Sequence, residues 1–404
     1  MFPRTLVAPV LEILRDFRKM AFISGPRQVG KTTLAKKIGD CFPQRRYFNW
    51  DIPAHQSELR VDPAFFEKDR RDPRRDFLVI FDEIHKLRGW KNYLKGVFDQ
   101  FEAEMAILVT GSGRLDLFQK GGDSLLGRYF HLPLYPLTVG ELQERSSSWQ
   151  EFLRALEAPG DLPACPHYEA LFRFGGFPEP LKRAQIGFYR RWSEERRKLL
   201  VREDIRDATA IRQISGVETL SRLLPERVGA PLSLNSLRED LQVAFDTVKD
   251  WLAVLEQFYV IFRIPPFAPS IKRAIRKEAK VYSYDWAELA DEGRRFENLL
   301  ALHLKKAVAL WRAMGQAEVT LHYLRDLEKR EVDFLIADRN RPICLIESKL
   351  HDQTLAKSLV HFQEALHVPF GIQVIHTPGV CFRRKTEGGY AWVVSADRFL
   401  SALP

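Results

Sequence analysis

The stretch that decides the fold reads Ser24-Gly25-Pro26-Arg27-Gln28-Val29-Gly30-Lys31-Thr32-Thr33. Its Gly-x-x-x-x-Gly-Lys-Thr spacing is the P-loop pattern. An apolar run at residues 20–23 can form a buried strand before it, and a helical pattern begins at Leu34. In such a loop the backbone N–H groups and a helix N-terminus face phosphates, and the lysine adds positive charge. The stretch therefore predicts a nucleoside triphosphate site formed by Gly25 to Thr33, with a chance glycine-rich turn as the alternative.

A second motif downstream supplies carboxylates. The apolar run Phe77 to Phe81 is followed directly by Asp82 and Glu83, and ligands in open α/β sheets collect at the carboxyl ends of parallel strands. We therefore expect Asp82 and the hydroxyl of Thr32 to bind Mg²⁺. We expect Glu83 to orient and deprotonate the attacking water.

Three further strands are expected around these motifs. The patterns indicate strands at Arg46 to Trp50, Ala106 to Thr110 and Tyr129 to Leu132. The strand that ends at Thr110 leads into a loop that contains Ser112. We expect Thr110 and Ser112 to contact the nucleotide near its γ-phosphate, because polar residues at this edge of the sheet face the ligand.

The composition excludes several classes of protein. The chain has 404 residues, of which 45% are hydrophobic and 12% aromatic, so disorder is not expected. It has neither an apolar run long enough for a membrane helix nor a secretory signal. Its cysteines show no Cys-x-x-Cys spacing, which argues against a zinc site and a disulfide framework: Cys41, Cys165, Cys344 and Cys381. We expect a cytoplasmic protein without a membrane partner.

The net charge of +9 leaves nucleic-acid binding open. Basic clusters can neutralise phosphates, but they can equally be solvated helix faces, so charge alone does not decide. The clusters are Arg70, Arg71, Arg74 and Arg75; Arg190, Arg191, Arg196, Arg197 and Lys198; and the stretch from Lys272 to Lys280.

Several segments together resemble a known family. They are Gly25 to Thr32, Phe81 to Lys86, Thr110 to Ser112, Leu126 to Arg128, and Leu134 to Glu141. The combination resembles prokaryotic AAA+ ATPases of the AAA_14/DUF4143 type. The resemblance implies ATP as the nucleotide, an α/β P-loop AAA+ core with a parallel sheet of order 5-1-4-3-2, and a homo-oligomer, with a hexameric ring as one form.

The same resemblance suggests an arginine finger that acts on the nucleotide of a neighbouring subunit. Arg128 is the first candidate and Arg114 the second. The alternative for Arg128 is a structural ion pair beneath the fifth strand.

The chain divides into four expected domains: an AAA+ core at 1–141, a helical lid at 142–210, a winged-helix domain at 211–270 and a nuclease-like domain at 271–404. Three helical patterns followed by a strand at Phe258 to Ile264 indicate the winged helix. Its third helix, Thr247 to Gln257, carries several acids. We therefore expect DNA to contact the basic stretch beyond it instead, at Lys272, Arg273, Arg276, Lys277 and Lys280.

The C-terminal part places carboxylates and a lysine on neighbouring strands. The period of two puts Glu347 and Lys349 on one strand face, and Asp333 lies on the preceding strand. Two acids around a divalent ion plus a lysine can hydrolyse phosphodiesters. The pattern also resembles the PD-(D/E)xK nucleases, which have an α/β restriction-endonuclease-like fold. By that resemblance Glu297 is the helix acid, Asp333 and Glu347 bind Mg²⁺ or Mn²⁺, and Lys349 is catalytic.

The sequence therefore predicts an AAA+ protein that hydrolyses ATP and acts on duplex, branched or single-stranded DNA by translocation, remodelling or branch migration. The C-terminal domain would cut or grip the DNA. Two alternatives stay open: a nucleotide-controlled switch that binds a protein partner and carries a catalytically dead C-terminal scaffold, and a motor that moves DNA without cutting it.

Overall fold

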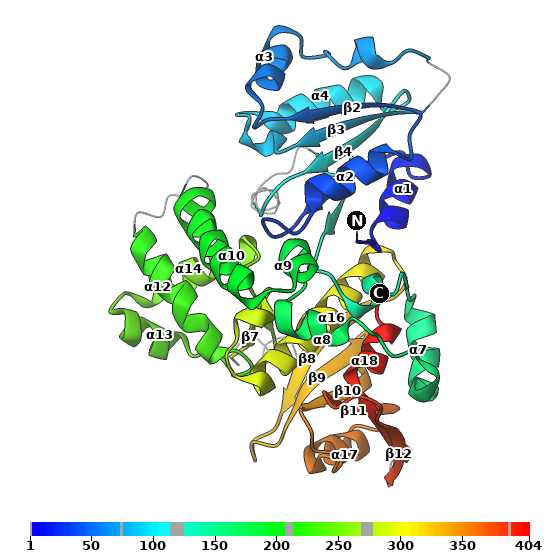
Figure 1. The fold of residues 1–404 in the computed structure, drawn as a ribbon, viewed down its shortest axis with the longest axis vertical. Coiled ribbons are helices and arrows are strands. Elements are labelled where there is room, and N and C mark those ends of the chain that lie inside the picture. The colour runs from blue at the N-terminus through cyan, green and yellow to red at the C-terminus, as the bar shows by residue number, and fades with distance from the viewer. Residues whose placement is uncertain (1, 73–75, 114–124, 207–212, 268–277, 387–388) are drawn as a thin grey trace. The chain divides into compact units, whose positions relative to one another are not determined.

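A computed structural model describes residues 2–72, 76–113, 125–206, 213–267, 278–386 and 389–404 (Figure 1). The chain forms two compact units. The P-loop unit contains Arg4–Tyr135 and Gln257–Tyr259, and the second unit contains Met1–Pro3, Pro136–Glu256 and Val260–Pro404. We describe each unit by itself.

The P-loop unit is built on a parallel five-stranded sheet of order β2-β3-β4-β1-β5. The strands are β1 (Met20–Ser24), β2 (Gln44–Asn49), β3 (Phe77–Asp82), β4 (Ala106–Thr110) and β5 (Tyr129–Pro133). This order confirms the expected 5-1-4-3-2 arrangement. The second strand begins two residues earlier than the pattern predicted.

Helices cover both faces of this sheet (Figure 1). They are α1 (Val7–Arg15), α2 (Lys31–Gly39), α3 (Pro53–Val61) and α4 (Trp90–Phe101), with 3-10 turns η1 (Glu67–Asp69) and η2 (Ile84–Lys86). Every residue of β1 and β3 is buried, as expected for the inner strands of a covered parallel sheet. Phe22, Phe81 and Val109 pack in the core that includes α4, whereas Ile80 faces Gly39 at the end of α2.

The second unit begins with helices. They are α6 (Val139–Leu142), α7 (Trp149–Glu157), η3 (Pro159–Asp161), α8 (Tyr168–Phe174), α9 (Pro178–Arg183), α10 (Ile186–Leu199) and a π-helical turn η4 (Leu200–Ile205). Ser148 and Glu151 form a capping box that begins α7.

Three helices and a two-stranded antiparallel sheet follow. The elements are α12 (Ile214–Leu223), η5 (Leu224–Arg227), α13 (Leu234–Leu241), α14 (Phe245–Gln257), β6 (Ile261–Ile264) and β7 (Lys280–Ser283). The Ser233 side chain caps α13 by accepting a hydrogen bond from the Ser236 N–H. The partner strand β7 lies beyond residue 270, where we expected the winged-helix domain to end.

The C-terminal part is a mixed six-stranded sheet of order β12-β13-β11-β10-β9-β8. Its elements are η6 (Trp286–Glu288), α16 (Glu292–Ala313), β8 (Val319–Arg325), β9 (Glu331–Asp338), β10 (Arg341–Lys349), α17 (Lys357–Ala365), β11 (Phe370–Ile375), β12 (Cys381–Thr386), β13 (Gly389–Ser395), α18 (Ala396–Phe399) and η7 (Leu400–Ala402). Strands β8, β9 and β10 are antiparallel, and β10, β11 and β13 are parallel.

A buried histidine on α16 makes the stability of the second unit depend on pH. His303 is fully buried, its Nε2 accepts a hydrogen bond from the Val139 N–H at 3.1 Å, and its Nδ1 lies 2.8 Å from the Leu299 carbonyl. Burial lowers the pKa of His303 from 6.5 to about 3. The folded state therefore keeps this ring neutral at pH values where the unfolded chain protonates it, and stability falls as pH drops below about 6.5.

We expect the contribution of His303 to lower the free energy of unfolding by about 1 kcal/mol between pH 7.5 and 5.5, because protonation then favours the unfolded chain. Denaturant titrations at both pH values, on the wild type and on His303→Gln, measure this contribution. The variant should lose that part of the pH dependence. An equal pH response in both proteins would contradict the assignment of a neutral buried ring.

Among the described residues, no helix has both the length and the apolar character needed to cross a membrane.

Candidate nucleotide site and carboxylate cluster

The P-loop joins the end of β1 to the start of α2. Gly25 (φ 154°), Gln28 (φ 65°) and Gly30 (φ 102°) have positive φ angles. A Cβ on Gly25 would lie only 2.4 Å from the Leu134 carbonyl oxygen. The protein's own backbone therefore requires a glycine at position 25, a reason that the motif alone did not reveal.

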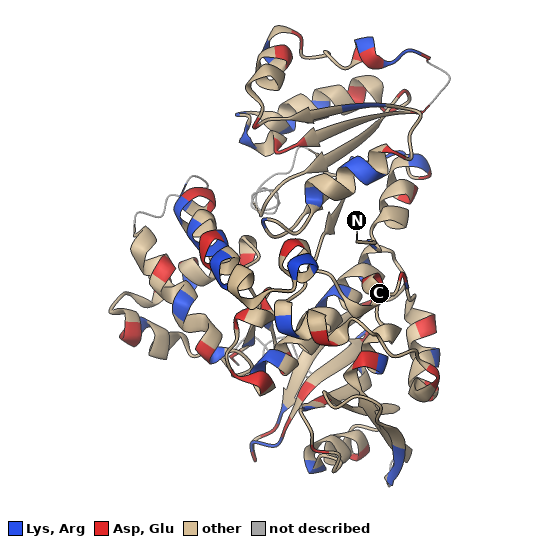
Figure 2. Cartoon of the chain, viewed as in Figure 1, with Lys and Arg blue, Asp and Glu red and all other residues tan. Residues whose placement is uncertain are grey.

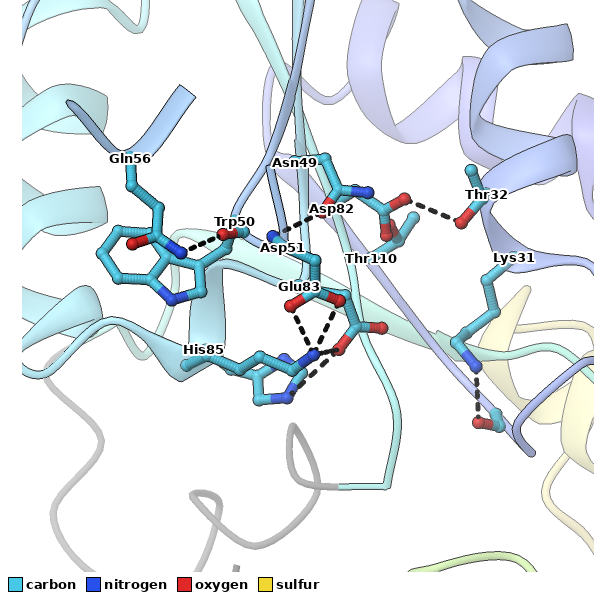
Figure 3. A network of polar contacts seen from close by, with 12 residues as sticks. Lys31, Thr32, Asn49, Trp50, Asp51, Gln56, Asp82, Glu83, His85 and Thr110 are labelled. Atoms are coloured by element: carbon cyan, nitrogen blue, oxygen red, sulfur yellow. Dashed lines mark hydrogen bonds and ion pairs between the residues drawn. The ribbon is translucent and has the colours of Figure 1, made fainter. Parts of the chain in front are cut away.

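The lysine of the loop is buried and held by the loop itself. Lys31 Nζ donates to the carbonyl oxygens of Gly25 at 3.0 Å and Pro26 at 2.8 Å (Figure 3). Its ammonium group is therefore held against the backbone at the start of the loop. The remaining predicted loop residues vary in exposure: Val29 is buried, Arg27, Gly30 and Thr32 are half-buried, and Gln28 and Thr33 are exposed.

Asp82 is the centre of a buried hydrogen-bond network. Its Oδ2 accepts a bond from Thr32 Oγ1 at 2.7 Å (Figure 3). The same oxygen accepts a bond from Tyr47 OH at 2.7 Å, and Oδ1 accepts one from Thr110 Oγ1 at 2.5 Å. Helix α2 and strands β2, β3 and β4 thus each bring one side chain to this point. The structure brings together Thr32, Asp82 and Thr110 as the sequence predicted.

Tyr47 belongs to this network although the sequence analysis missed it. Its hydroxyl also accepts a bond from Asn49 Nδ2 at 3.2 Å. Burial, together with the Asp82 carboxylate, raises the pKa of Tyr47. Its position two residues before the end of β2 was the available signal, but that signal depends on the register with β3, which pairs Asn49 with Asp82.

Glu83 sits beside Asp82 in a left-handed backbone conformation. Its φ is 58°, and its backbone N–H donates to the Thr110 carbonyl at 2.9 Å. Non-glycine residues rarely adopt this conformation, and they do so most often at functional sites. Here it turns the carboxylate away from Asp82.

Basic side chains surround the Glu83 carboxylate. Its Oε2 lies 3.5 Å from His85 Nε2 and 3.6 Å from Lys86 Nζ, and Lys86 also contacts Asp51 at 2.6 Å (Figure 3). Burial raises the pKa of Glu83, while the ammonium groups of Lys31 and Lys86 oppose that rise. The sequence analysis had assigned no role at the site to His85, Lys86 or Asp51.

The oxygen atoms at this site fit a magnesium ion. Mg²⁺ in nucleotide sites takes one or two protein oxygens, and substrate phosphates and water complete its shell. The Thr32 hydroxyl and the Asp82 carboxylate are such a pair and lie within 2.7 Å of each other. Among the described residues there is no group of three or more His, Cys, Asp or Glu that could hold a metal ion by itself.

Three predicted residues remain: Ser112 and the two candidates for the arginine finger. Ser112 follows β4 and is half-buried. Arg128 forms a two-point ion pair with Asp99 of α4, through Nε at 2.6 Å and Nη2 at 3.0 Å. That ion pair is the structural alternative expected for Arg128. Arg114 lies outside the described residues.

In the second unit, three carboxylates from α16 and β9 surround one buried lysine. Lys280 on β7 is only 1% exposed, and its Nζ lies 2.7 Å from Glu331, 3.2 Å from Glu297 and 3.4 Å from Asp333. Burial disfavours the charge of Lys280, yet the carboxylates around it raise its pKa. The expectation that Lys280 contacts DNA is therefore wrong, because its ammonium is enclosed by acids.

The other predicted residues of this cluster come together. Asp333 on β9 and Glu347 on β10 each lie next to the paired residues Phe334 and Ile346, and the Asp333 N–H donates to Glu347 Oε2 at 3.4 Å. Lys349 Nζ contacts Glu347 Oε1 at 2.8 Å. Asp333 Oδ2 accepts bonds from Ser348 N–H at 2.9 Å and Ser348 Oγ at 2.6 Å.

The cluster has an excess of negative charge. Burial and the Asp333 carboxylate raise the pKa of both Glu297 and Glu347 to about 7. A divalent cation would relieve that excess, and adjacent carboxylates are suitable ligands. However, Asp333 Oδ1 and Glu297 Oε1 face Lys280, so a metal has to compete with an ammonium group that the chain supplies itself.

The basic clusters are less available for phosphates than their sequence suggested. Figure 2 shows acidic residues interleaved with the basic ones on the helices. Arg196 is buried, Arg197 pairs with Glu288 at 2.8 Å, and Lys198 pairs with Glu194 at 2.8 Å. In this cluster Arg190 and Arg191 are exposed.

The other basic clusters are described only in part. Arg70 pairs with Glu104, and Arg71 is exposed. The remaining ones lie outside the described residues: Arg74, Arg75, Lys272, Arg273, Arg276 and Lys277.

Comparison with protein families divides the chain into three matched segments. Residues 17–143 match the AAA domain family, residues 165–290 match a domain of unknown function (DUF8612), and residues 292–388 match another (DUF4143). Together with the sheet order, the first match supports a P-loop AAA+ α/β core and an AAA-type ATPase. The expected resemblance is confirmed at that level. The second match runs across the expected boundaries at 210 and 270.

Two bacterial relatives match most of this chain, and neither has an assigned activity. An uncharacterized protein of Mycobacterium tuberculosis is 24% identical over 383 residues, covering 89% of this chain and 80% of the other. One from Haemophilus influenzae is 22% identical over 319 residues, covering 72% and 74%. AMPPCP-bound DnaA from Aquifex aeolicus aligns with a TM-score of 0.30 at 15% identity, covering 62% and 86%.

Proposed function

We propose that this chain hydrolyses ATP at the P-loop site and uses the cycle to act on DNA as a homo-oligomer. One observation carries the proposal: three hydroxyl groups converge on the Asp82 carboxylate, next to the P-loop lysine and Glu83. Three hydroxyl donors fix the orientation of this buried carboxylate before the nucleotide and Mg²⁺ bind.

Each residue of the site has a defined role in this proposal. Lys31 binds the β- and γ-phosphates, and Thr32 and Asp82 hold Mg²⁺, which neutralises charge on the phosphates. Glu83 accepts a proton from the attacking water. Burial supports that role, because it raises the pKa of Glu83 and makes its carboxylate a stronger base than an exposed one.

The DNA part of the proposal rests on the second unit. Helices α12 to α14 followed by the β6–β7 sheet have the order of a winged helix. The order α16-β8-β9-β10-α17-β11 supports a restriction-endonuclease-like domain. In that domain Asp333 and Glu347 would hold Mg²⁺ or Mn²⁺, and Lys349 would stabilise charge on a phosphodiester.

A second candidate function is favoured by Lys280. Its ammonium occupies the middle of the carboxylate cluster, where it contacts two of the oxygens that a metal would use. A nuclease-like scaffold of this kind needs no metal to neutralise its acids. The chain would then be a nucleotide-controlled switch whose C-terminal domain binds a partner without cutting.

Cleavage assays separate these two candidates. We expect the full chain, with Mg²⁺ or Mn²⁺ and with ATP, to cut at least one of linear, nicked, branched and single-stranded DNA. Asp333→Asn should abolish cutting and leave ATP hydrolysis unchanged, since it removes charge from the cluster alone. Asp338→Asn, on the same strand but outside the cluster, is the matched control and should still cut.

Two results would contradict the nuclease part of the proposal and leave the switch and a motor that does not cut DNA. One is a wild type that cuts none of these DNAs with either metal. The other is an Asp333→Asn protein that cuts as fast as the wild type, which would assign the cleavage to a contaminant.

A further inference from the structure

The last residue of α14 and the two residues after it belong to the P-loop unit. Gln257 to Tyr259 belong to that unit, whereas the residues on either side belong to the other one. Phe258 and Tyr259 are 2% and 5% exposed. The segment is therefore a buried part of the P-loop unit although it lies far from it in sequence.

The Tyr259 hydroxyl hydrogen-bonds to the residue that begins the P-loop. It lies 2.5 Å from Ser24 Oγ, and Ser24 Oγ is also 2.5 Å from His131 Nε2 of β5. Ser24 is fully buried, and its backbone oxygen accepts a bond from the Leu134 N–H at 2.7 Å. Ser24 is thus fixed on both sides, directly before Gly25.

The backbone at Tyr259 adopts a conformation that bulky residues rarely take. Its φ is 57°, in the left-handed region. The Val260 N–H donates to the Leu255 carbonyl at 2.9 Å and closes the end of α14. This reversal of the chain delivers the tyrosine ring to Ser24, which gives a physical reason for the unusual backbone.

The same segment contacts the loop that follows β4. A Cβ on Gly113 would lie 2.1 Å from the Gln257 carbonyl oxygen and 2.8 Å from Phe258 Cα. Only glycine allows this approach. Gly113 lies in the loop after Thr110, the last residue of β4, whose side chain bonds to Asp82. The segment therefore contacts both the residue before the P-loop and the loop that follows β4.

We propose that Tyr259 is a positioning residue of the nucleotide site and that segment Gln257–Tyr259 ties that site to the end of α14. Tyr259 acts through Ser24 and does not touch the nucleotide. Lys31 donates a hydrogen bond to the carbonyl oxygen of Gly25, the residue after Ser24. A movement of the Lys31 ammonium group on nucleotide binding would therefore act on the backbone next to the serine that Tyr259 contacts. This inference rests on the proposed function of the P-loop site.

The test is Tyr259→Phe, which removes the hydroxyl and keeps the ring. We expect binding of a non-hydrolysable ATP analogue with Mg²⁺, measured by calorimetry, to weaken about 3- to 10-fold, the range of one buried hydrogen bond. Ser24→Ala should weaken it similarly, and the double variant should be no weaker than either single variant. Tyr93→Phe is the matched control, since its hydroxyl bonds to Pro63 O in the same unit, away from the site.

A second readout tests the tie to α14. In the wild type, adding the analogue should slow hydrogen exchange in the last turn of α14, and Tyr259→Phe should remove that response. The inference is overturned if Tyr259→Phe binds the analogue as tightly as the wild type does. It is also overturned if the losses in binding free energy of Tyr259→Phe and Ser24→Ala add up in the double variant. A wild type that binds no ATP analogue would overturn the proposed function as well.

Discussion

Glu83→Gln is expected to bind ATP as tightly as the wild type and to hydrolyse it about 10²- to 10⁴-fold more slowly, the usual contribution of a general base. The substitution keeps the shape of the side chain and one acceptor oxygen, but it removes the negative charge and the ability to accept a proton. The left-handed backbone at Glu83 and its bond to Thr110 are unchanged by it, so the site should stay assembled.

The complementary change is Lys31→Ala, which should weaken ATP binding itself. Lys31 would contact the phosphates in the bound state, whereas Glu83 acts mainly when water is activated. Binding and steady-state hydrolysis are measured for both variants, with Glu104→Gln as a control, because Glu104 pairs with Arg70 and was assigned no role at the site. A Glu83→Gln protein that turns over ATP at the wild-type rate would show that another residue is the base.

Arg128→Ala is expected to bind ATP normally and to lose about 10³- to 10⁵-fold in hydrolysis, as removal of an arginine finger does elsewhere. Mixing it with Glu83→Gln should restore part of the rate, because some interfaces then pair an intact arginine with an intact glutamate. The expectation requires that Arg128 leaves Asp99 when subunits assemble, since the two form an ion pair in the single chain.

Asp99→Asn distinguishes the two roles of Arg128. It breaks the ion pair but keeps the guanidinium, so a trans-acting arginine predicts near wild-type hydrolysis for this variant. Equal losses in Asp99→Asn and Arg128→Ala, together with no recovery on mixing exchangeable subunits, would assign Arg128 to the ion pair alone.

The parts of the fold that sequence predicted well are those fixed by local patterns. The P-loop and the acidic end of β3 have spacings that only a few structures satisfy, and the resemblance to AAA+ ATPases supplied the sheet order. Asp82 and Thr110 meet because neighbouring parallel strands end at one edge of the sheet, and Thr32 reaches Asp82 from the first turn of α2.

The residues that sequence missed depend on pairings between distant segments. Tyr47 reaches Asp82 through the β2–β3 register, and Tyr259 reaches Ser24 although the two are far apart in the chain. The prediction failed at Lys280 for a related reason. In the sequence it closes a run of basic residues, whereas its neighbours in space are carboxylates from α16 and β9.

The measurement that tests the central claim most directly is ATP hydrolysis by the full chain with and without DNA. Single-stranded, duplex and branched DNAs are added at saturating concentration, binding is verified separately, and Glu83→Gln serves as the background. We predict that at least one DNA form raises the rate of the wild type and leaves that of Glu83→Gln at background. ATP hydrolysis that is unchanged by every DNA that binds would contradict the account.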